Sequence, residues 1–435
     1  MSGSVRDGNL RGRGRKYSGD RVGGMTVFTT ATNRTAPPHG TDPADRHRST
    51  AVAWERARVL AHAAPQPLAA RRVPLTYAAG RTLAEEIRAC VPLPAFDTAA
   101  MDGYAVAGRG PWQLRGQVRA GTVWKGALAS GEAVEISTGA QVPVGASAVL
   151  PVELAVRDGA TVSGAGHSGG PHIRRAGEDA PAGAPLAPTG TRIGPALLGL
   201  AATCGYDTLL VCPRPWVRIL VTGEELTHSG MSGAGRVRDA LGPLLPTLVD
   251  ELGGEVREVR HLPDHPAGLL ATAMHPPEED GIAEVVVVTG STSIGVTDRL
   301  RQLLRASAAR WVVDTVACRP GHPQLLAGLG ARRWVVGLPG NPFAALAAAY
   351  TLLAPLLAGL SGRRLPELPQ APVTGHVRPA PGLTRLIPVA WEGGVARVIG
   401  GHRAAFLRGA ALADALATIP PCWVDGTPVP LLLTR

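Results

Sequence analysis

Residues 285–295 read Val-Val-Val-Val-Thr-Gly-Ser-Thr-Ser-Ile-Gly, a continuous β-branched run that ends in glycines and small hydroxyl residues. A strand without polar alternation is typical of a parallel sheet that is covered by helices on both faces. Similar runs alternate with helical segments on both sides of it. The expected strands are 217–221, 255–262, 285–288, 311–313 and 334–336, and the expected helices are 239–252, 267–274, 298–306 and 343–360. This order predicts a doubly wound α/β domain over residues 213–364.

Three of these strands end in polar turns, at residues 222–226, 289–295 and 338–342. Because the carboxyl ends of parallel strands meet at one edge of a sheet, we expect the three loops to lie together. Gly, Ser and Thr residues let backbone N–H groups and hydroxyls converge on a phosphate. For any single loop, an ordinary turn with a helix cap is an equally good interpretation. Three loops at one edge favour an anion site.

Acidic residues accompany these loops. Glu224 and Glu225 follow the first strand, and Asp239 and Asp298 stand near the starts of expected helices. A carboxylate beside bound phosphate is typical of Mg²⁺, which takes one or two carboxylates together with phosphate oxygens. The alternative for Asp239 and Asp298 is that each only caps its helix.

Two further motifs could carry chemistry. Residues 319–323 read Arg-Pro-Gly-His-Pro and place two potentially cationic side chains on a rigid turn, where an oxyanion could be held. A plain surface turn explains them equally well. Asp102 precedes Gly103 among small apolar residues, which by itself favours an Asp-Gly turn. The twelve histidines show no metal-binding spacing, and His261 and His265 are expected to be solvated.

The 435 residues are 45% hydrophobic and 18% charged, which indicates a globular protein and excludes collagen, a coiled coil and wholesale disorder. Outside the α/β domain, short apolar runs between Gly and Pro predict smaller β domains. Residues 1–48 are expected to form a disordered basic tail and residues 365–435 a small C-terminal β domain, and a further small β domain is expected between about 114 and 162. Helices are expected at 50–64, 77–87 and 195–204.

The net charge of +10 raises nucleic acid as a partner, but nine Arg and Lys and four Asp in residues 1–48 carry half of that charge. Nucleic-acid binding by the body is therefore not expected. Five scattered cysteines predict neither a disulfide framework nor a structural zinc site. The apolar stretch 343–360 is short for a membrane span and contains Pro355. We expect a buried helix, no membrane partner and a cytoplasmic protein.

Taken together, these segments resemble the molybdopterin molybdenumtransferases, the family of bacterial MoeA and of the E domain of gephyrin, from about residue 51 onwards. The motifs that carry the resemblance are Leu93–Asp97, Met101–Ala105, Ile136–Pro143, Gly177–Asp179, Thr222–Leu226, Ser293–Gly295 with Asp298, Pro320-Gly321 with Pro323, and Leu338–Pro342. The resemblance implies a homodimer in which each chain has a discontinuous helical stalk at 49–96 and 168–212, a β insertion domain at 97–167, a molybdopterin-binding α/β domain at 213–364 and a small C-terminal β domain at 365–435. It also implies that the α/β domain of one subunit faces the insertion domain of the other.

The family reaction takes adenylylated molybdopterin and molybdate as substrates and Mg²⁺ as cofactor, releases AMP and inserts molybdenum at the dithiolene sulfurs. The resemblance implies Asp102, Glu225, Asp298 and Arg319 in catalysis, with Asp239 and Asp298 as Mg²⁺ ligands. The implied substrate-binding residues are Thr138, Thr222, Gly223, Gly290, Ser291, Thr292, Ser293, Gly295, His322, Gly340 and Asn341. Other cofactor-biosynthesis proteins and molybdoenzymes are the further partners that it implies.

Some positions depart from the family pattern. The family's Lys-Pro-Gly-Lys-Pro reads Arg-Pro-Gly-His-Pro at 319–323, and a further family lysine falls at Thr315. Asp239 is followed by Ala240 and Leu241, so the usual Asn is lost. Arginine and lysine are not equivalent at an oxyanion site. A second interpretation therefore stays open, in which the chain binds molybdopterin or its adenylate as a carrier or partner protein without turnover.

Overall fold

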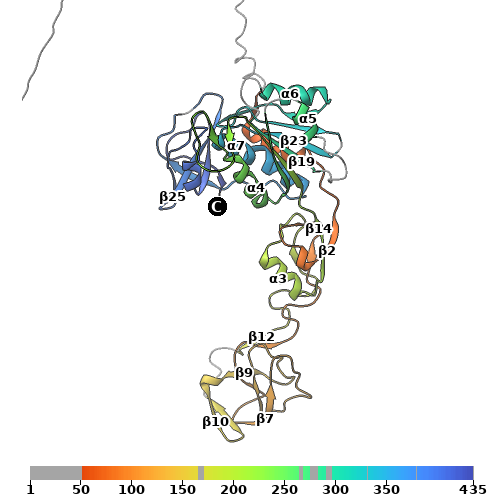
Figure 1. The fold of residues 1–435 in the computed structure, drawn as a ribbon. Helices are drawn as coiled ribbons and strands as arrows, with labels where there is room; N and C mark the ends of the chain where they lie inside the picture. Colours follow the sequence, from red (N-terminus) through yellow and green to blue (C-terminus); the bar gives the residue numbers. More distant parts are fainter. Residues whose placement is uncertain are drawn as a thin grey trace, which may run out of the picture.

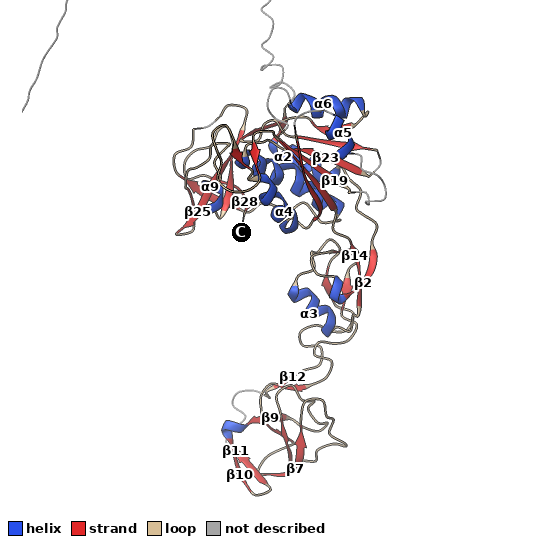
Figure 2. Ribbon diagram, in the orientation of Figure 1, coloured by secondary structure: helices blue, strands red, loops and turns tan. Residues whose placement is uncertain are grey.

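The computed structural model describes residues 51–164, 171–263, 268–274, 283–290, 296–330, 332–378 and 380–434. Three lobes follow one another in Figure 1: a head that contains the α/β and C-terminal domains, a small stalk, and the β insertion domain at the far end. Helices gather in the head, and the stalk and insertion domain are made mainly of strands and loops (Figure 2). The predicted disordered tail at 1–48 lies outside the described residues.

The α/β domain is built on a six-stranded sheet of order β18-β15-β19-β23-β22-β20. Its strands are β15 (Trp216–Thr222), β18 (Glu255–Leu262), β19 (Val285–Thr289), β20 (Arg310–Val313), β22 (Leu325–Leu329) and β23 (Arg333–Gly337). The first four strands in the order are parallel, and β22 and β20 complete the far edge as antiparallel strands. The prediction of a mostly parallel sheet is confirmed, although β22 was not among the expected strands.

Helices cover both faces of this sheet. On one face lie α4 (Leu241–Glu251), α7 (Pro342–Ala348), the π-helical segment η4 (Ala349–Leu353) and α8 (Ala354–Leu360), and on the other lie α5 (Gly268–Met274) and α6 (Val296–Ala306). Successive residues of β19 pack on opposite faces of the sheet. Val287 belongs to the hydrophobic core on the first face and Val286 to the core on the second. Burial on both faces explains why the strand lacks polar alternation.

The apolar segment Pro342–Leu360 is, among the described residues, the one helix long and apolar enough to cross a membrane. It is 83% buried inside the head. Leu352, Leu353 and Leu356 belong to the same core cluster as Val217 of the sheet. The prediction of a buried helix is therefore confirmed.

The first helix, α2 (Trp54–Ala63), packs in the head, whereas the expected boundary at residue 49 assigned it to the stalk. Trp54 Nε1 donates a hydrogen bond to Thr351 Oγ1 at 3.0 Å, and Ala57 and Ala61 lie fully buried against the apolar helix pair. Small residues four apart allow two helices to approach closely. The contact joins residues 297 positions apart, so local sequence spacing could not reveal it.

The stalk itself is made mostly of short strands. Its elements are β2 (Arg71–Pro74), η1 (Leu75–Tyr77), β3 (Thr82–Leu83), β4 (Ile87–Arg88), β5 (Thr98–Ala99), β12 (Ile173–Arg174), β13 (Pro185–Ala187), α3 (Pro195–Thr203) and β14 (Thr208–Cys212). The helix predicted at 77–87 is wrong, because Gly80 has φ +72° and β3 pairs with β14 instead. The helix predicted at 195–204 is confirmed as α3.

The insertion domain is a six-stranded sheet of order β10-β11-β7-β8-β6-β9. Its elements are β6 (Gly103–Val106), β7 (Trp112–Val118), β8 (Glu132–Ile136), β9 (Ala148–Pro151), η2 (Val152–Leu154), β10 (Ala155–Asp158) and β11 (Thr161–Gly164). Strands β6, β8 and β9 pair antiparallel, which places Gly103 beside both Ile136 and Pro151. The loops before β6 and after β8 therefore come together.

The C-terminal domain contains a seven-stranded sheet of order β1-β21-β25-β26-β24-β28-β27. Its elements are β1 (Val52–Ala53), β21 (Val316–Arg319), β24 (Gln370–Thr374), β25 (Thr384–Glu392), β26 (Val395–Val398), α9 (Arg408–Leu412), β27 (Ala415–Ile419) and β28 (Pro428–Leu433). Strand β21 follows β20 of the α/β sheet in the chain but pairs parallel with β25 of the C-terminal domain, which places Arg319 opposite Arg385. Backbone hydrogen bonds thus join the two domains of the head.

Candidate functional site

Three strand-end loops meet at the carboxyl edge of the α/β sheet. Thr222 Oγ1 donates a hydrogen bond to Thr289 O at 2.8 Å, which ties the end of β15 to the end of β19. Gly290 has φ +79°, and a Cβ there would lie 2.3 Å from Thr222 O; a Cβ at Gly340 would lie 3.2 Å from the Gly290 Cα. The loops therefore pack backbone against backbone, and the prediction that they lie together is confirmed for their described residues.

Part of the expected site lies outside the described residues, namely Ser291, Thr292, Ser293 and Gly295. Asp298 was expected at a helix N-cap. Helix α6 begins at Val296, so Asp298 lies within its first turn. The structure therefore corrects the position of Asp298 in the helix.

The loop after β15 is held by its own neighbours. Arg236 donates from Nη1 to Glu224 O at 2.7 Å and from Nη2 to Leu226 O at 3.1 Å. The carboxylate of Glu225 folds over Gly223, because a Cβ on that glycine would lie 2.8 Å from Glu225 Oε2. Glu225 is exposed and lies at the sheet edge beside the phosphate-type loops.

A cavity of about 550 Å³ lies where the α/β domain meets the C-terminal domain. Arg319 and His322 line it from the α/β side, and Arg385, His402 and Arg403 line it from the C-terminal side. The last three were not among the predicted site residues. Register alone brings Arg385 there, because Arg319 and Arg385 are partners in the β21–β25 pair.

The cavity is strongly cationic. Burial, and then the charge of Arg319, lower the pKa of Arg385. Burial, and then the charges of Arg385 and Arg403, lower the pKa of His402. His402 Nδ1 is buried without a hydrogen-bond partner. Crowded guanidinium groups beside an unsatisfied imidazole nitrogen suit an oxyanion, since charge-assisted hydrogen bonds would relieve both costs.

His322 has a fixed orientation in this cavity. Its Nδ1 lies 2.7 Å from Val316 O, and a carbonyl oxygen can only accept, so Nδ1 carries the hydrogen. This leaves Nε2 for a ligand, and Nε2 can donate only when the ring is protonated. Asn341 also lines the cavity, directly before α7. Arg319 and His322 from one motif and Asn341 from another therefore share one cavity.

Asp102 and Thr138 are brought together in the insertion domain. Asp102 Oδ1 accepts hydrogen bonds from Thr138 N at 2.6 Å and from Thr138 Oγ1 at 3.0 Å. The backbone hydrogen bond, followed by the hydroxyl, lowers the pKa of Asp102, so the carboxylate is ionised at neutral pH. Both residues are exposed. The insertion domain that carries them lies at the opposite end of the molecule from the head (Figure 1). Within one chain they do not join the sheet edge.

A larger cavity, of about 730 Å³, lies in the insertion domain. Arg109, Trp112 and Ser163 are among its lining residues, and Arg109 is the charged residue of that lining. It lacks the convergence of charged groups seen in the head. The cationic cavity is therefore the better candidate for a polar ligand.

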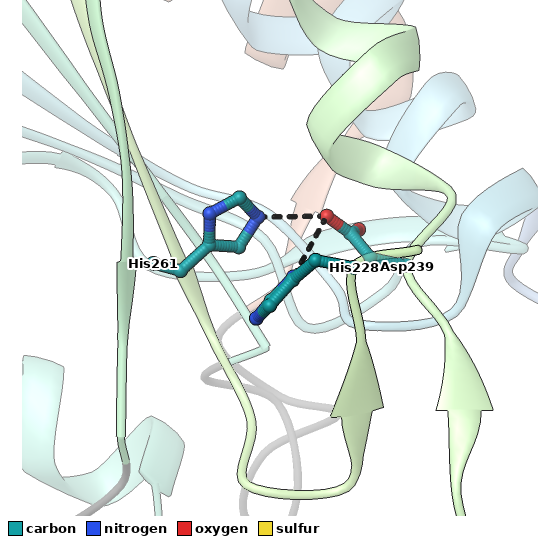
Figure 3. Close-up of side chains that lie close together, drawn as sticks. All are labelled: His228, Asp239 and His261. Carbon is teal, nitrogen blue, oxygen red and sulfur yellow. Dashed lines mark hydrogen bonds and ion pairs between the residues drawn. The ribbon is translucent and has the colours of Figure 1, made fainter. Parts of the chain in front are cut away.

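His228, Asp239 and His261 form a third cluster (Figure 3). Asp239 Oδ2 lies 2.8 Å from His261 Nε2 and 3.9 Å from His228 Nδ1. Asp239 Oδ1 accepts hydrogen bonds from the N–H groups of Leu241 and Gly242. His261 is exposed, as predicted, and its ring also bonds to Asp239, a contact that the sequence did not predict. The alternative that Asp239 only caps its helix is confirmed in part. Its Oδ1 accepts from the first turn of α4, although the N-cap residue is Ala240, and its Oδ2 bonds to His261.

The environment of Asp239 bears on its expected role as a Mg²⁺ ligand. Burial opposes ionisation, but the hydrogen bonds from Gly242, His261 and Leu241 outweigh it, so the pKa of Asp239 is lowered. The neighbouring donors are two imidazoles, and Mg²⁺ prefers oxygen ligands. Asp239 with these neighbours therefore does not fit Mg²⁺. The side chain of Asp298, the other expected ligand, lies outside the described residues.

Comparisons with known proteins agree with one another. Residues 50–205 match the model of the MoeA N-terminal region (domain I and II), and residues 218–359 match that of a probable molybdopterin binding domain. Over 69% of its length, the chain is 33% identical to a molybdopterin molybdenumtransferase of Synechococcus elongatus and 31% identical to one of Haemophilus influenzae, covering 77% and 75% of those proteins. A molybdopterin biosynthesis MoeA protein from Pyrococcus horikosii aligns with TM-score 0.64 at 27% identity, over 89% of this chain and 100% of that one.

Proposed function

The chain belongs to the family of molybdopterin molybdenumtransferases, a family of molybdenum cofactor biosynthesis, and we propose that it inserts molybdenum from molybdate into adenylylated molybdopterin with release of AMP. The observation that carries this proposal is the cationic cavity beside the three strand-end loops. The two substrates are both anions, one with phosphates and one a compact oxyanion. The head offers a separate environment for each.

Molybdate would bind in the cavity between the two domains of the head. Arg319, Arg385 and Arg403 supply planar donor groups that suit the oxygens of a dianion. His402 Nδ1, which lacks a partner, would donate to the same ligand. The cations of the C-terminal domain thus supplement Arg319 at a motif where the family has two lysines.

The phosphates of the adenylylated substrate would bind at the loop edge. Backbone N–H groups of the three loops would donate to the phosphate oxygens. Gly290 and Gly340 help by letting the loops approach one another closely. Asn341 directly precedes the long apolar helix that begins at Pro342, and a helix N-terminus favours negative charge. Thr222 helps by holding the first two loops together.

Cleavage of the phosphoanhydride needs a water oxygen to bond to phosphorus while the bond to the AMP oxygen breaks. Glu225, exposed at the loop edge, is the carboxylate that would orient this water and take its proton. Asp102, held ionised by Thr138, would act from the other side of the ligand. Because Asp102 lies in the far lobe, this role requires a homodimer in which the insertion domain of one subunit reaches the head of the other.

Mg²⁺, the expected cofactor, would neutralise charge that develops on the phosphates. Asp298 remains its proposed ligand. Asp239 would not hold Mg²⁺, because the surrounding imidazoles do not fit that ion.

The test is AMP release from adenylylated molybdopterin, measured with and without molybdate. Release that depends on molybdate would support the transferase and show that Arg319 and His322 replace the family lysines. Release that ignores molybdate would mean that the phosphate loops work without the oxyanion cavity. Absence of release with the ligand still bound would overturn the enzyme proposal.

A second candidate function is binding without turnover, as a carrier or partner in cofactor delivery to other biosynthetic proteins or molybdoenzymes. The observation that favours it is the replacement of the family lysines at Thr315, Arg319 and His322. The absence of AMP release, with tight binding of adenylylated molybdopterin, would select it. A cytoplasmic location, and the lack of nucleic-acid and membrane partners, remain predictions of both.

A further inference from the structure

The cluster of His228, Asp239 and His261 is, within the described residues, the one group of three His, Cys, Asp or Glu side chains whose ligand atoms all lie within 4.8 Å of one another. The three residues come from different parts of the α/β domain. None of the anion-binding roles proposed above uses the two histidines. Their convergence on one buried carboxylate therefore needs its own explanation.

The backbone builds this cluster through a two-stranded parallel pair. Strand β16 (Leu226–Thr227) pairs with β17 (Val237–Arg238), so His228 and Asp239 are the next residues along each strand. Asp239 N also donates a hydrogen bond to Thr227 O at 3.0 Å. His261 is supplied by β18, at the edge of the main sheet. The side chains are thus positioned by regular structure on both sides of the carboxylate.

An ordinary hydrogen-bonded pair explains only part of this geometry. His261 bonds to Asp239, but His228 Nδ1 stands 3.9 Å from the same oxygen, beyond hydrogen-bond distance. The two rings are tilted by 53° with centroids 3.9 Å apart. Two protonated imidazoles this close would repel each other, whereas one shared dication would satisfy both nitrogens and the oxygen.

The separations match those around a small metal ion. Two ligand atoms bound to tetrahedral zinc at about 2.0–2.1 Å stand about 3.4 Å apart. The observed separations from Asp239 Oδ2, 2.8 and 3.9 Å, lie on either side of that value. The two imidazole nitrogens lie within 4.8 Å of each other, so a bound ion would draw the exposed rings together. Exposed side chains change rotamer readily.

The burial pattern resembles a metal site with open positions. The Asp239 side chain is 5% exposed, whereas those of His261 and His228 are 35% and 53% exposed. A buried anion thus faces two solvent-accessible nitrogen donors. Three protein ligands leave a further coordination position for water or a ligand oxygen, as in catalytic zinc sites.

We propose that His228, Asp239 and His261 bind a first-row transition-metal dication of the zinc class in preference to Mg²⁺. Nitrogen ligands favour borderline metals, and a two-histidine, one-carboxylate set is typical of zinc, cobalt or iron(II). The site lies beside β18, the edge strand of the main sheet. His228 and Asp239 reach it from the β16–β17 pair, which follows the loop after β15. The proposal concerns binding by the chain alone and does not rest on molybdenum insertion.

Titration of the full chain with ZnCl₂, followed by calorimetry, tests the proposal directly. We expect one Zn²⁺ per chain with micromolar or tighter affinity, retained in about a 1000-fold excess of MgCl₂. Co²⁺ should give the visible absorption of a four- or five-coordinate site, without a cobalt–thiolate charge-transfer band. Displacement by Mg²⁺, or a thiolate band that points to the cysteines, would overturn the proposal.

Variants locate the site. His228→Gln and His261→Gln should each weaken Zn²⁺ binding by at least about 30-fold, since each removes a ligand. His376→Gln removes an exposed imidazole from the C-terminal domain and should bind as the unmodified chain does. Equal affinity in all three variants would rule the cluster out.

A measurement on the unmodified chain keeps the test decisive if a variant fails to fold. Bound Co²⁺ should broaden the NMR signals of two of the twelve histidines at one equivalent. Unchanged signals would contradict the proposal. Zinc binding without AMP release would support this site and oppose the proposed function, and AMP release without zinc binding would do the reverse.

Discussion

The two ends of the same sheet edge have opposite chemistry. At the β18 end, a buried carboxylate meets two imidazoles, with Asp239 as the central group. At the β23 end, guanidinium groups meet imidazoles around a cavity, and no carboxylate is among its lining residues. The loops that begin at Gly223 and Gly290 lie between these ends, because β15 and β19 stand between β18 and β23 in the sheet.

The contrast shows how neighbours decide what a histidine can bind. His261 faces a carboxylate and can serve as a neutral nitrogen ligand for a cation. His402 faces Arg385 and Arg403 and is suited to donate to an anion. A ligand with phosphates in the middle would thus have a cation site at one end and an oxyanion site at the other. The predictions below test this division.

The largest effect is expected at the cationic end. Arg319→Ala should raise the molybdate concentration needed for half-maximal AMP release by about 100-fold, the value of a charge-assisted contact of about 1.5–3 kcal/mol. Zinc binding at the other end should not change. Arg319→Lys should recover most of the loss, and Arg56→Ala, on the exposed face of α2, is the matched control. An Arg319→Ala chain with normal molybdate dependence would remove the oxyanion role of this cavity.

The second prediction concerns the junction between the two ends. Gly290→Ala should lower the free energy of unfolding by about 1–3 kcal/mol, because its Cβ would meet Thr222 O at φ +79°. Denaturant unfolding measures this change. Gly426→Ala, at φ +83° with no atom within 4 Å of the added Cβ, should cost about 1 kcal/mol at most. Equal losses in both variants would mean that the backbone contact between the loops contributes nothing.

The third prediction is a pH dependence at the cationic end. The pKa of His402 is lowered in the free cavity, and a bound dianion favours the protonated ring. Molybdate binding should therefore take up a proton and tighten as the pH falls through the ordinary histidine range, with a slope of at most about tenfold per pH unit. Calorimetry between about pH 5 and 8 measures it. His402→Gln should flatten the profile, and a steeper profile in that variant would contradict the assignment.

The same lowered pKa has a consequence for stability. His402 is neutral in the folded chain at a pH where it would be charged in the unfolded chain. The stability that depends on neutral His402 is therefore fully present above the pKa that His402 has in the unfolded chain. It is lost as the pH falls through the pKa that His402 has in the folded chain. Molybdate should oppose this loss.

The smallest expected effect is the partial recovery of activity in mixed dimers. It tests whether Asp102 of one subunit completes the site at the sheet edge of the other. At the molybdate concentration that half-saturates the unmodified protein, Asp102→Asn and Arg319→Ala chains should each be nearly inactive. Mixed at equal amounts, half of the dimers are hybrids with one intact site, so activity should return to about one quarter of that of the unmodified protein. No recovery after subunit exchange would mean that Asp102 and Arg319 do not act in one site across a dimer.

Much of the head could be predicted from local pattern. The valine run at 285–288 is buried on both faces, so its sequence alone indicates a covered parallel strand. The loops at 222–226 and 338–342 could be placed together because parallel strands end at one edge. Only their sequence order and strand type were needed for that conclusion.

The rest depends on contacts between distant residues. Arg385 and His402 reach the cavity because β21 pairs with β25, and nothing near either residue signals this pairing. His228 and His261 lie 11 and 22 positions from Asp239 and meet it only through the short β16–β17 pair and the edge strand. The helix expected at 77–87 failed because strand pairing overrode its local helical pattern.

The shared sheet of the head has a consequence for how the protein is made. Strands β1 and β21 are synthesised well before β25, yet all three stand side by side in one sheet. A nascent chain that ends before residue 384 would contain Arg319 but would lack β25, the strand that positions Arg385 opposite it. The cationic cavity therefore cannot form before β25 is made. Chains that stop earlier would contain the loops after β15, β19 and β23 but would lack Arg385, His402 and Arg403.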